Sequence, residues 1–207
     1  MILLCISKRL HATFILRCFN DTIAMTFAYG SILSLMKEKS GLCTLLFTLG
    51  LSIKMNVLLF LPALYMCLSR KHGILKATSH LVFIVLSQLI IGYEFISQHP
   101  ASYFAKAFEF SREFTFKWSV NWNFLGEELA LNPTFAKILL ACHLGFLVYF
   151  LLSKWTSKVT TLFSDLRLNF WSDNGHERLL HPEFVAKTFF ICNFLGIMFA
   201  RSLHYQF

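Results

Sequence analysis

The chain has 207 residues, about the length of one domain, and 56% of them are apolar while only 14% are charged. Soluble domains average about 45–50% apolar and 25% charged, so these values and the 24 phenylalanines point to lipid and exclude disordered, collagen-like and disulfide-stapled secreted proteins. The net charge of +8 would suggest nucleic-acid binding in a soluble protein, but in a multi-span chain it indicates basic cytoplasmic loops.

Five apolar stretches approach the roughly 20 residues that a helix needs to cross the hydrocarbon layer. In chain order they are residues 22–36, 42–68, 77–96, 135–152 and 184–200. The second stretch is long and contains Lys54, Asn56 and Pro62, so two short helices are the alternative there. The pattern predicts an all-α fold, a multi-pass transmembrane helical bundle of about five spans within one domain, residues 1–207.

The distribution of basic residues predicts which loops face the cytoplasm. If the spans alternate, residues 7–21, 69–76 and 153–183 share one side and hold ten Lys and Arg residues, against six on the other side. The more basic side is predicted to be cytoplasmic, which places residues 97–132 on the luminal side. Two helices within 42–68 would change this assignment of sides.

The predicted luminal loop, residues 97–132, interleaves Phe, Tyr and Trp with charged side chains. Part of the loop repeats at spacings of three and four residues, as in an amphipathic helix that lies in the membrane interface. Aromatic side chains are enriched at that level of a membrane. The loop is therefore expected either to anchor the fold or to form a surface for a lipid-linked substrate.

Lys54 and Asn56 are the most informative polar residues inside an apolar stretch. A charge within a span costs about 2.5–3.5 kcal/mol, so such residues usually pair or line a cavity. A lysine that faces the bundle is suited to bind a phosphate or to pair with a carboxylate. The alternative is a salt bridge or a side chain that extends toward the interface near a helix break.

Two further clusters lie on the predicted luminal side. Glu127 and Glu128 adjoin aromatic residues, and a carboxylate there could take the proton from an acceptor hydroxyl, although the solvated first turn of a helix has the same pattern. After the last span, Arg201, His204 and Gln206 form a group of donors suited to a phosphate and a sugar, or a plain interfacial cap.

The sequence predicts neither a metal site nor a bound cofactor. It contains no P-loop, no dinucleotide-binding fingerprint, no H-E-x-x-H and no G-x-S-x-G. Its eight histidines are scattered, and its six cysteines include no C-x-x-C pair. The cysteines are interpreted as small buried hydrophobic residues.

Three motifs together resemble a known family. The first is residues 54–60 (KMNVLLF), the second is residues 120–128 (VNWNFLGEE), and the third combines residues 193–196 (NFLG) with residues 201–207 (RSLHYQF). Residues 16–21 (LRCFND) are also similar to the R-L-F-N-D stretch of that family. In order and spacing, along essentially the whole chain, they resemble the endoplasmic-reticulum dolichyl-phosphate-mannose-dependent alpha-1,3-mannosyltransferases of lipid-linked oligosaccharide assembly, of the GT-C superfamily.

The resemblance implies a multi-pass enzyme of the endoplasmic-reticulum membrane with its chemistry in the lumen. It would transfer mannose, with inversion, from dolichyl phosphate mannose to the dolichyl-diphosphate-linked five-mannose oligosaccharide. Its partners would be these dolichol-linked donor and acceptor lipids, with no nucleotide sugar, metal or nucleic acid. The alternatives are a non-catalytic truncated membrane protein, a transporter or flippase, or another dolichyl-phosphate-mannose-dependent mannosyltransferase.

The resemblance also suggests roles for individual residues. The expected donor-phosphate or sugar contacts are Lys54, Asn56, Arg201, His204 and Gln206. Asn121 and Trp122 are expected to shape the luminal pocket, and Asn123 stands where the family usually has Arg. The catalytic acidic residue is expected upstream of Met1 and further helices are expected after Phe207, so the chain is expected to be a central fragment.

Overall fold

All regular elements in the described part of the chain are helices, which confirms the predicted all-α fold class. The computed structural model describes residues 8, 19–107, 116, 121–155 and 180–200. In chain order the elements are α3 (Asp21–Met36), α4 (Ser40–Ile53), η2 (Met55–Phe60), α5 (Leu61–His72), α6 (Ile74–Ile91), α7 (Tyr93–Gln98), α8 (Pro100–Ala107), η4 (Asn123–Leu125), α9 (Glu127–Leu131), α10 (Pro133–Phe150), η5 (Leu151–Trp155) and α12 (Pro182–Met198).

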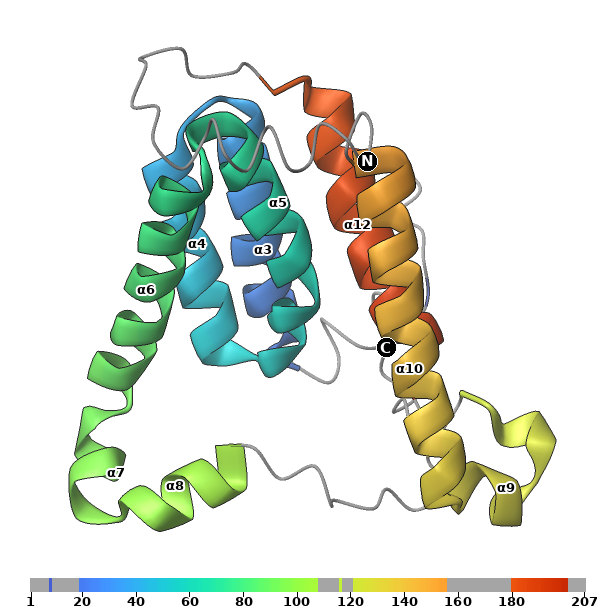
Figure 1. Cartoon of the computed structure of the whole chain (residues 1–207). Helices are drawn as coiled ribbons and strands as arrows, with labels where there is room; N and C mark the ends of the chain where they lie inside the picture. The colour runs from blue at the N-terminus through green and yellow to red at the C-terminus, as the bar shows by residue number, and fades with distance from the viewer. Residues whose placement is uncertain (1–7, 9–18, 108–115, 117–120, 156–179, 201–207) are drawn as a thin grey trace.

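The longer helices run up and down between two ends of the molecule (Figure 1). We call one the Lys54 end, because α3 begins there and Lys54 directly follows α4. We call the other the Glu38 end, because Glu38 lies in the turn between α3 and α4. From the Glu38 end, α6 and α12 run toward the Lys54 end, and α10 runs in the opposite direction (Figure 1).

Residues 42–68 do not form one continuous span; the two-helix alternative is what the structure shows. Helix α4 ends at Ile53, Lys54 has an extended backbone (φ −149°, ψ 126°), and a 3-10 turn, η2, leads into α5. Pro62 lies in the first turn of α5. Backbone N–H groups in that turn have no partner within the helix, so the proline costs no hydrogen bond. As a consequence α5 runs antiparallel to α4, and residues 37–39 lie at the same end as residues 69–73 (Figure 1).

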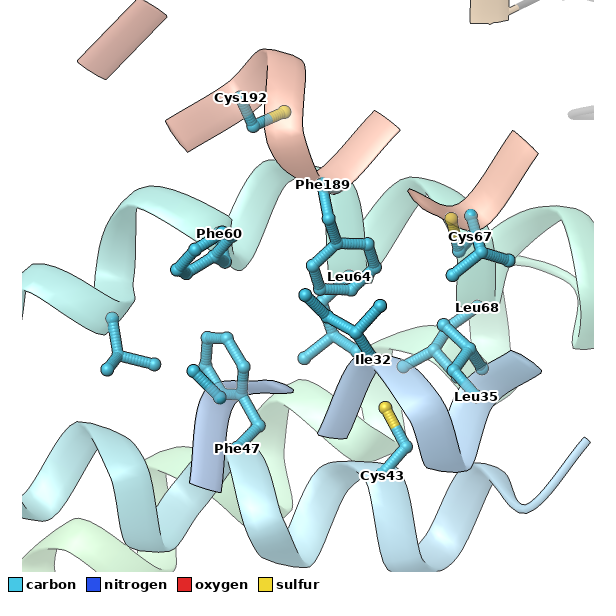
Figure 2. Close-up of a cluster of buried hydrophobic side chains, with 14 of the residues drawn as sticks. Ile32, Leu35, Cys43, Phe47, Phe60, Leu64, Cys67, Leu68, Phe189 and Cys192 are labelled. Carbon is cyan, nitrogen blue, oxygen red and sulfur yellow. The ribbon is translucent and has the colours of Figure 1, made fainter. Parts of the chain in front are cut away.

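The core lies between α3, α4, α5 and α12. Figure 2 shows Phe47 of α4, Leu64 of α5 and Phe189 of α12 directed toward the same interior as Ile32 of α3. Phe189 also packs against Phe60, with ring centroids 6.1 Å apart. The core therefore joins the α3–α4 hairpin to α5 and, across more than a hundred residues of sequence, to α12.

Small residues allow α3 and α4 to approach closely. A Cβ atom on Gly50 would lie 3.2 Å from the carbonyl oxygen of Ala24 and 3.3 Å from Cβ of Phe27. Ala24 and Ala28, four residues apart on α3, are both buried. This arrangement of small residues on facing helices is typical of helix pairs in membranes, where van der Waals packing replaces the hydrophobic effect.

Gly50→Leu is expected to lower the free energy of unfolding by about 1–3 kcal/mol, because a side chain at residue 50 must push α3 away from α4. Gly41→Leu is the matched control, since a Cβ on Gly41 of the same helix meets nothing within 4 Å. Thermal unfolding of the purified chain in detergent measures both variants. Equal melting temperatures for the two variants would contradict the proposed close contact.

A polar seam, Thr44 and Thr48 of α4 with His80 and Gln88 of α6, holds α6 against α4. A hydrogen bond of 2.8 Å joins Thr44 Oγ1 to His80 Nδ1. Gln88 Nε2 donates to the Thr48 carbonyl oxygen at 2.9 Å. The seam secures the inner face of α6, while side chains such as Leu75 and Ile90 are exposed on its outer surface.

Polar contacts also connect the helices at the Glu38 end. Lys71 of α5, only 3% exposed, forms an ion pair with Glu38 and donates from Nζ to the Glu38 carbonyl oxygen at 2.8 Å. Glu38 Oε1 accepts the backbone N–H of Leu180, which precedes α12, at 3.2 Å. Arg70 donates to the Trp155 carbonyl oxygen at 3.0 Å and lies over the Phe184 ring, 4.5 Å from its centroid.

Two helices in the described ranges are long and apolar enough to cross a membrane, Ile74–Ile91 and Pro133–Trp155. Only 11% and 6% of their most apolar windows are buried inside the protein. Their apolar side chains therefore face outward, as expected of helices that contact lipid. The helix boundaries lie within about five residues of the predicted stretches 77–96 and 135–152.

Candidate functional site

An ion pair between Lys54 and Asp21 forms the centre of the candidate site. Asp21 is the first residue of α3, where the helix dipole favours a carboxylate. Lys54 follows the last residue of α4 and returns its side chain toward α3. Both side chains are largely buried, with exposed fractions of 19% for Lys54 and 10% for Asp21. The sequence predicted that Lys54 either binds a phosphate or pairs with a carboxylate, and the structure shows it paired with the carboxylate of Asp21.

The residues that follow Lys54 pack against the last turns of α12. Asn56 is half-buried within η2. A Cβ atom on Gly196 of α12 would lie 2.6 Å from Leu59 Cδ2, so any larger residue at 196 would require the Leu59 side chain of η2 to move. The break after α4 and the C-terminal part of α12 are therefore held together at the Lys54 end.

Asn121 binds the C-terminal end of α12. Its Nδ2 atom donates to the carbonyl oxygens of Ile197 at 3.0 Å, Met198 at 3.4 Å and Ala200 at 2.7 Å. The last carbonyl groups of a helix have no partner within the helix, and the side chain of Asn121 supplies one. Asn121 thus fixes the direction in which the chain leaves α12, immediately before Arg201.

Trp122 has an unusual backbone conformation. Its φ of 61° and ψ of 11° lie in the left-handed region, which bulky residues rarely adopt and which costs about 1–2 kcal/mol. Its indole packs edge-on against Phe135, with centroids 5.7 Å apart, and its Nε1 atom is buried without a hydrogen-bond partner among the described residues. Strain of this kind is often concentrated at binding sites.

The predicted acidic candidates lie apart from this cluster. Glu127 and Glu128 are exposed in the first turn of α9, a short helix that packs against η4 and the start of α10. Both side chains are thus solvent-exposed at the start of a helix, and their catalytic role stays a prediction. Arg201, His204 and Gln206 lie outside the described residues, and Ala200 is the last described residue before them.

The sequence analysis did not single out two residues that build this site, Asp21 and Gly196. Asp21 could have been suspected, because an acidic residue at the border of an apolar stretch is a natural partner for a lysine placed inside another stretch. Gly196 ends the NFLG motif quoted above, but the motif assigns it no role, because its contact is with Leu59, which is remote in the sequence.

Comparison with protein families matches residues 1–207 to the family described as "ALG3 protein". The chain belongs to the ALG3 protein family. It is 41% identical over 207 residues to the "Probable Dol-P-Man:Man(5)GlcNAc(2)-PP-Dol alpha-1,3-mannosyltransferase" of Dictyostelium discoideum, a match that covers 100% of this chain and 46% of the relative.

Two further relatives of the ALG3 family carry the name "Dol-P-Man:Man(5)GlcNAc(2)-PP-Dol alpha-1,3-mannosyltransferase". The Arabidopsis thaliana protein is 39% identical over 216 residues, covering 99% of this chain and 49% of the relative. The Homo sapiens protein is 38% identical over 207 residues, covering 98% of this chain and 46% of the relative. The chain thus spans about half the length of the curated relatives it matches. No solved structure matches the chain.

Proposed function

We propose that this chain transfers mannose from dolichyl phosphate mannose to the dolichyl-diphosphate-linked five-mannose oligosaccharide, forming an alpha-1,3 linkage, in the endoplasmic-reticulum membrane. The observation that carries the proposal is the identity of 36–41% with named alpha-1,3-mannosyltransferases along essentially the whole chain. Dolichol-linked lipids are the donor and the acceptor, and neither a metal nor a cofactor takes part.

The proposed arrangement is a GT-C-like, multi-pass bundle with the Lys54 end in the lumen. The positive-inside rule supports this orientation. Of the described basic residues other than Lys8, those at the Glu38 end are Lys37, Lys39, Arg70, Lys71, Lys76, Lys154 and Lys187, and those at the Lys54 end are Lys54, Lys106 and Lys137. Helices α4 and α5 are then two passes of a hairpin, and α7 and α8 lie in the luminal interface.

The proposed role of the Lys54 cluster is to bind the donor. Lys54 and Asn56 contact the phosphate or the sugar, and Arg201, His204 and Gln206 join them from the segment that follows α12. Cationic donors near the phosphate stabilise the negative charge that develops on it as the mannosyl bond breaks. Asn121 directs that segment, and Trp122 forms part of the pocket wall. The catalytic base is not assigned. Glu127 and Glu128 are the candidates for it within this chain, and both are weak.

The test uses cells that lack their own alpha-1,3-mannosyltransferase. One sample expresses this chain, a second expresses the human relative with its matching segment replaced by this whole chain, and a third expresses the unmodified relative as a control. Extension of the five-mannose glycan by one alpha-1,3-linked mannose in the first or second sample supports the proposal. If both proteins are present in the membrane and neither extends the glycan, or if the new linkage differs, the proposal is wrong.

A further inference from the structure

Asp21 is a buried acidic residue in the candidate site to which no role has been assigned. The residue is 7% exposed, and one of its carboxylate oxygens, Oδ1, pairs with Lys54 Nζ. The other oxygen, Oδ2, is buried and has no hydrogen-bond partner among the described residues. Half of this carboxylate has thus lost its contact with water without gaining a protein partner.

A buried ion pair of this kind is a poor device for stability alone. Removing two charges from water is expensive, and the attraction between them compensates only when their remaining hydrogen-bonding groups are satisfied. A well-packed apolar pair in the same place is often as stable or more stable. Glu38 Oε2, in the ion pair with Lys71 at the opposite end, is also buried without a hydrogen bond among the described residues, so the unsatisfied oxygen alone does not indicate function. The location of the Asp21–Lys54 pair, at the end of the molecule that carries the other candidate residues, is what favours a functional role for it.

The position of Lys54 indicates what that role is. A lysine side chain is a flexible four-carbon stem, and catalysis requires its charge to be held at a fixed place. Lys54 lies at the helix break, two residues before Asn56, where the backbone is extended and does not itself restrict the side chain to a helix face. Protein kinases use the same arrangement, in which a lysine that contacts phosphate is held by a glutamate from a separate helix.

We propose that Asp21 is a positioning residue that holds the Lys54 ammonium group where the donor phosphate binds. In this proposal Asp21, a buried carboxylate paired with Lys54, acts through the lysine and does not touch the substrate. An ammonium group has three N–H donors, so a lysine can contact a carboxylate and a phosphate at the same time. The inference rests on the proposed function, in which Lys54 contacts the phosphate of dolichyl phosphate mannose.

The competing role for Asp21 is a purely structural clamp between α3 and α4. The chain offers a matched control for that role, because Glu38 and Lys71 form a second, mostly buried ion pair at the opposite end. Asp21→Asn and Glu38→Gln each remove the acidic partner of a lysine. Only the first of them is expected to change the binding of the donor.

The experiment measures initial rates of mannosyl transfer in microsomes at varied concentrations of dolichyl phosphate mannose and of acceptor. The protein is this chain, expressed alone or within the human relative, according to which of the two extends the five-mannose glycan. Asp21→Asn is expected to lower kcat/KM for the donor about tenfold, with the KM for the acceptor and the amount of protein changed less than about twofold. Asp21→Glu is expected to recover most of the donor affinity. Asp21→Asn is expected to add nothing to Lys54→Met, because Asp21 acts through Lys54.

Each contrary result identifies what has failed. If Asp21→Asn lowers only the amount of protein, as Glu38→Gln would, or if its effect on kcat/KM adds fully to that of Lys54→Met, Asp21 is a structural clamp. A lower KM for the donor would show that Asp21 competes with the phosphate for Lys54. If the unsubstituted chain transfers mannose but Lys54→Met leaves kcat/KM for the donor unchanged, the proposed role of Lys54 fails, while mannosyl transfer itself stands.

Discussion

Lys54→Met is expected to lower kcat/KM for dolichyl phosphate mannose by about 10²–10³-fold, the cost of removing one charged donor from a site where charge develops. Methionine keeps the length and the apolar part of the side chain but removes the ammonium group. Cells that express the variant should accumulate the five-mannose glycan. The size distribution of dolichol-linked glycans measures the block, and microsomal rates measure its magnitude.

Two controls separate this effect from loss of the fold. Lys137→Met makes the same change in charge at an exposed position near the start of α10, and it should leave the glycan profile unchanged. Lys54→Met also leaves the Asp21 carboxylate buried without its cation, which is destabilising. The double variant with Asp21→Asn removes that buried charge. A double variant that is abundant in the membrane and fully active would overturn the role of Lys54.

Asn121→Asp is expected to reduce mannosyl transfer about tenfold or more, because it reverses the interaction at the end of α12. The amide nitrogen that donates to three carbonyl oxygens becomes a carboxylate oxygen, which repels them. Residues 197–200 should separate from residue 121, so the end of α12 should lose a contact that holds it in place. Transfer rates and hydrogen exchange of the amides at the end of α12 measure the two effects.

Asn132→Asp is the matched control for Asn121→Asp. Asn132 uses its side-chain oxygen to accept the Thr134 N–H at 2.8 Å at the start of α10. Aspartate is an equally good residue at that position of a helix, so transfer and exchange should both be unchanged. If Asn121→Asp behaves like Asn132→Asp, the contact with α12 has no functional importance.

The helical class and the approximate helix positions could be predicted from the sequence, because both follow from the length and continuity of apolar stretches. The break at Lys54 could be anticipated only as an alternative. Charged and polar residues within an apolar stretch are compatible with a bent helix, a break or a buried pair, and neighbouring helices decide among them. The separation of α4 and α5 thus required the structure.

The contacts that build the candidate site were beyond prediction for a different reason. Asp21 and Lys54 are 33 residues apart, and Asn121 and Ile197 are 76 residues apart. Hydrophobic periodicity describes which face of a helix is buried, but it does not identify the helix that lies opposite. The left-handed backbone of Trp122 is likewise imposed by its surroundings, since a bulky residue has no local preference for that conformation.

The polar seam between α4 and α6 has a consequence for the biosynthesis of the protein. His80 and Gln88 lie within an apolar segment, and in the proposed multi-pass arrangement an isolated α6 would expose them to hydrocarbon without partners. Their partners, Thr44 and Thr48, belong to α4, which the ribosome completes earlier. We therefore expect the insertion machinery to retain α4 until α6 emerges and to release the two helices into the bilayer as a pair.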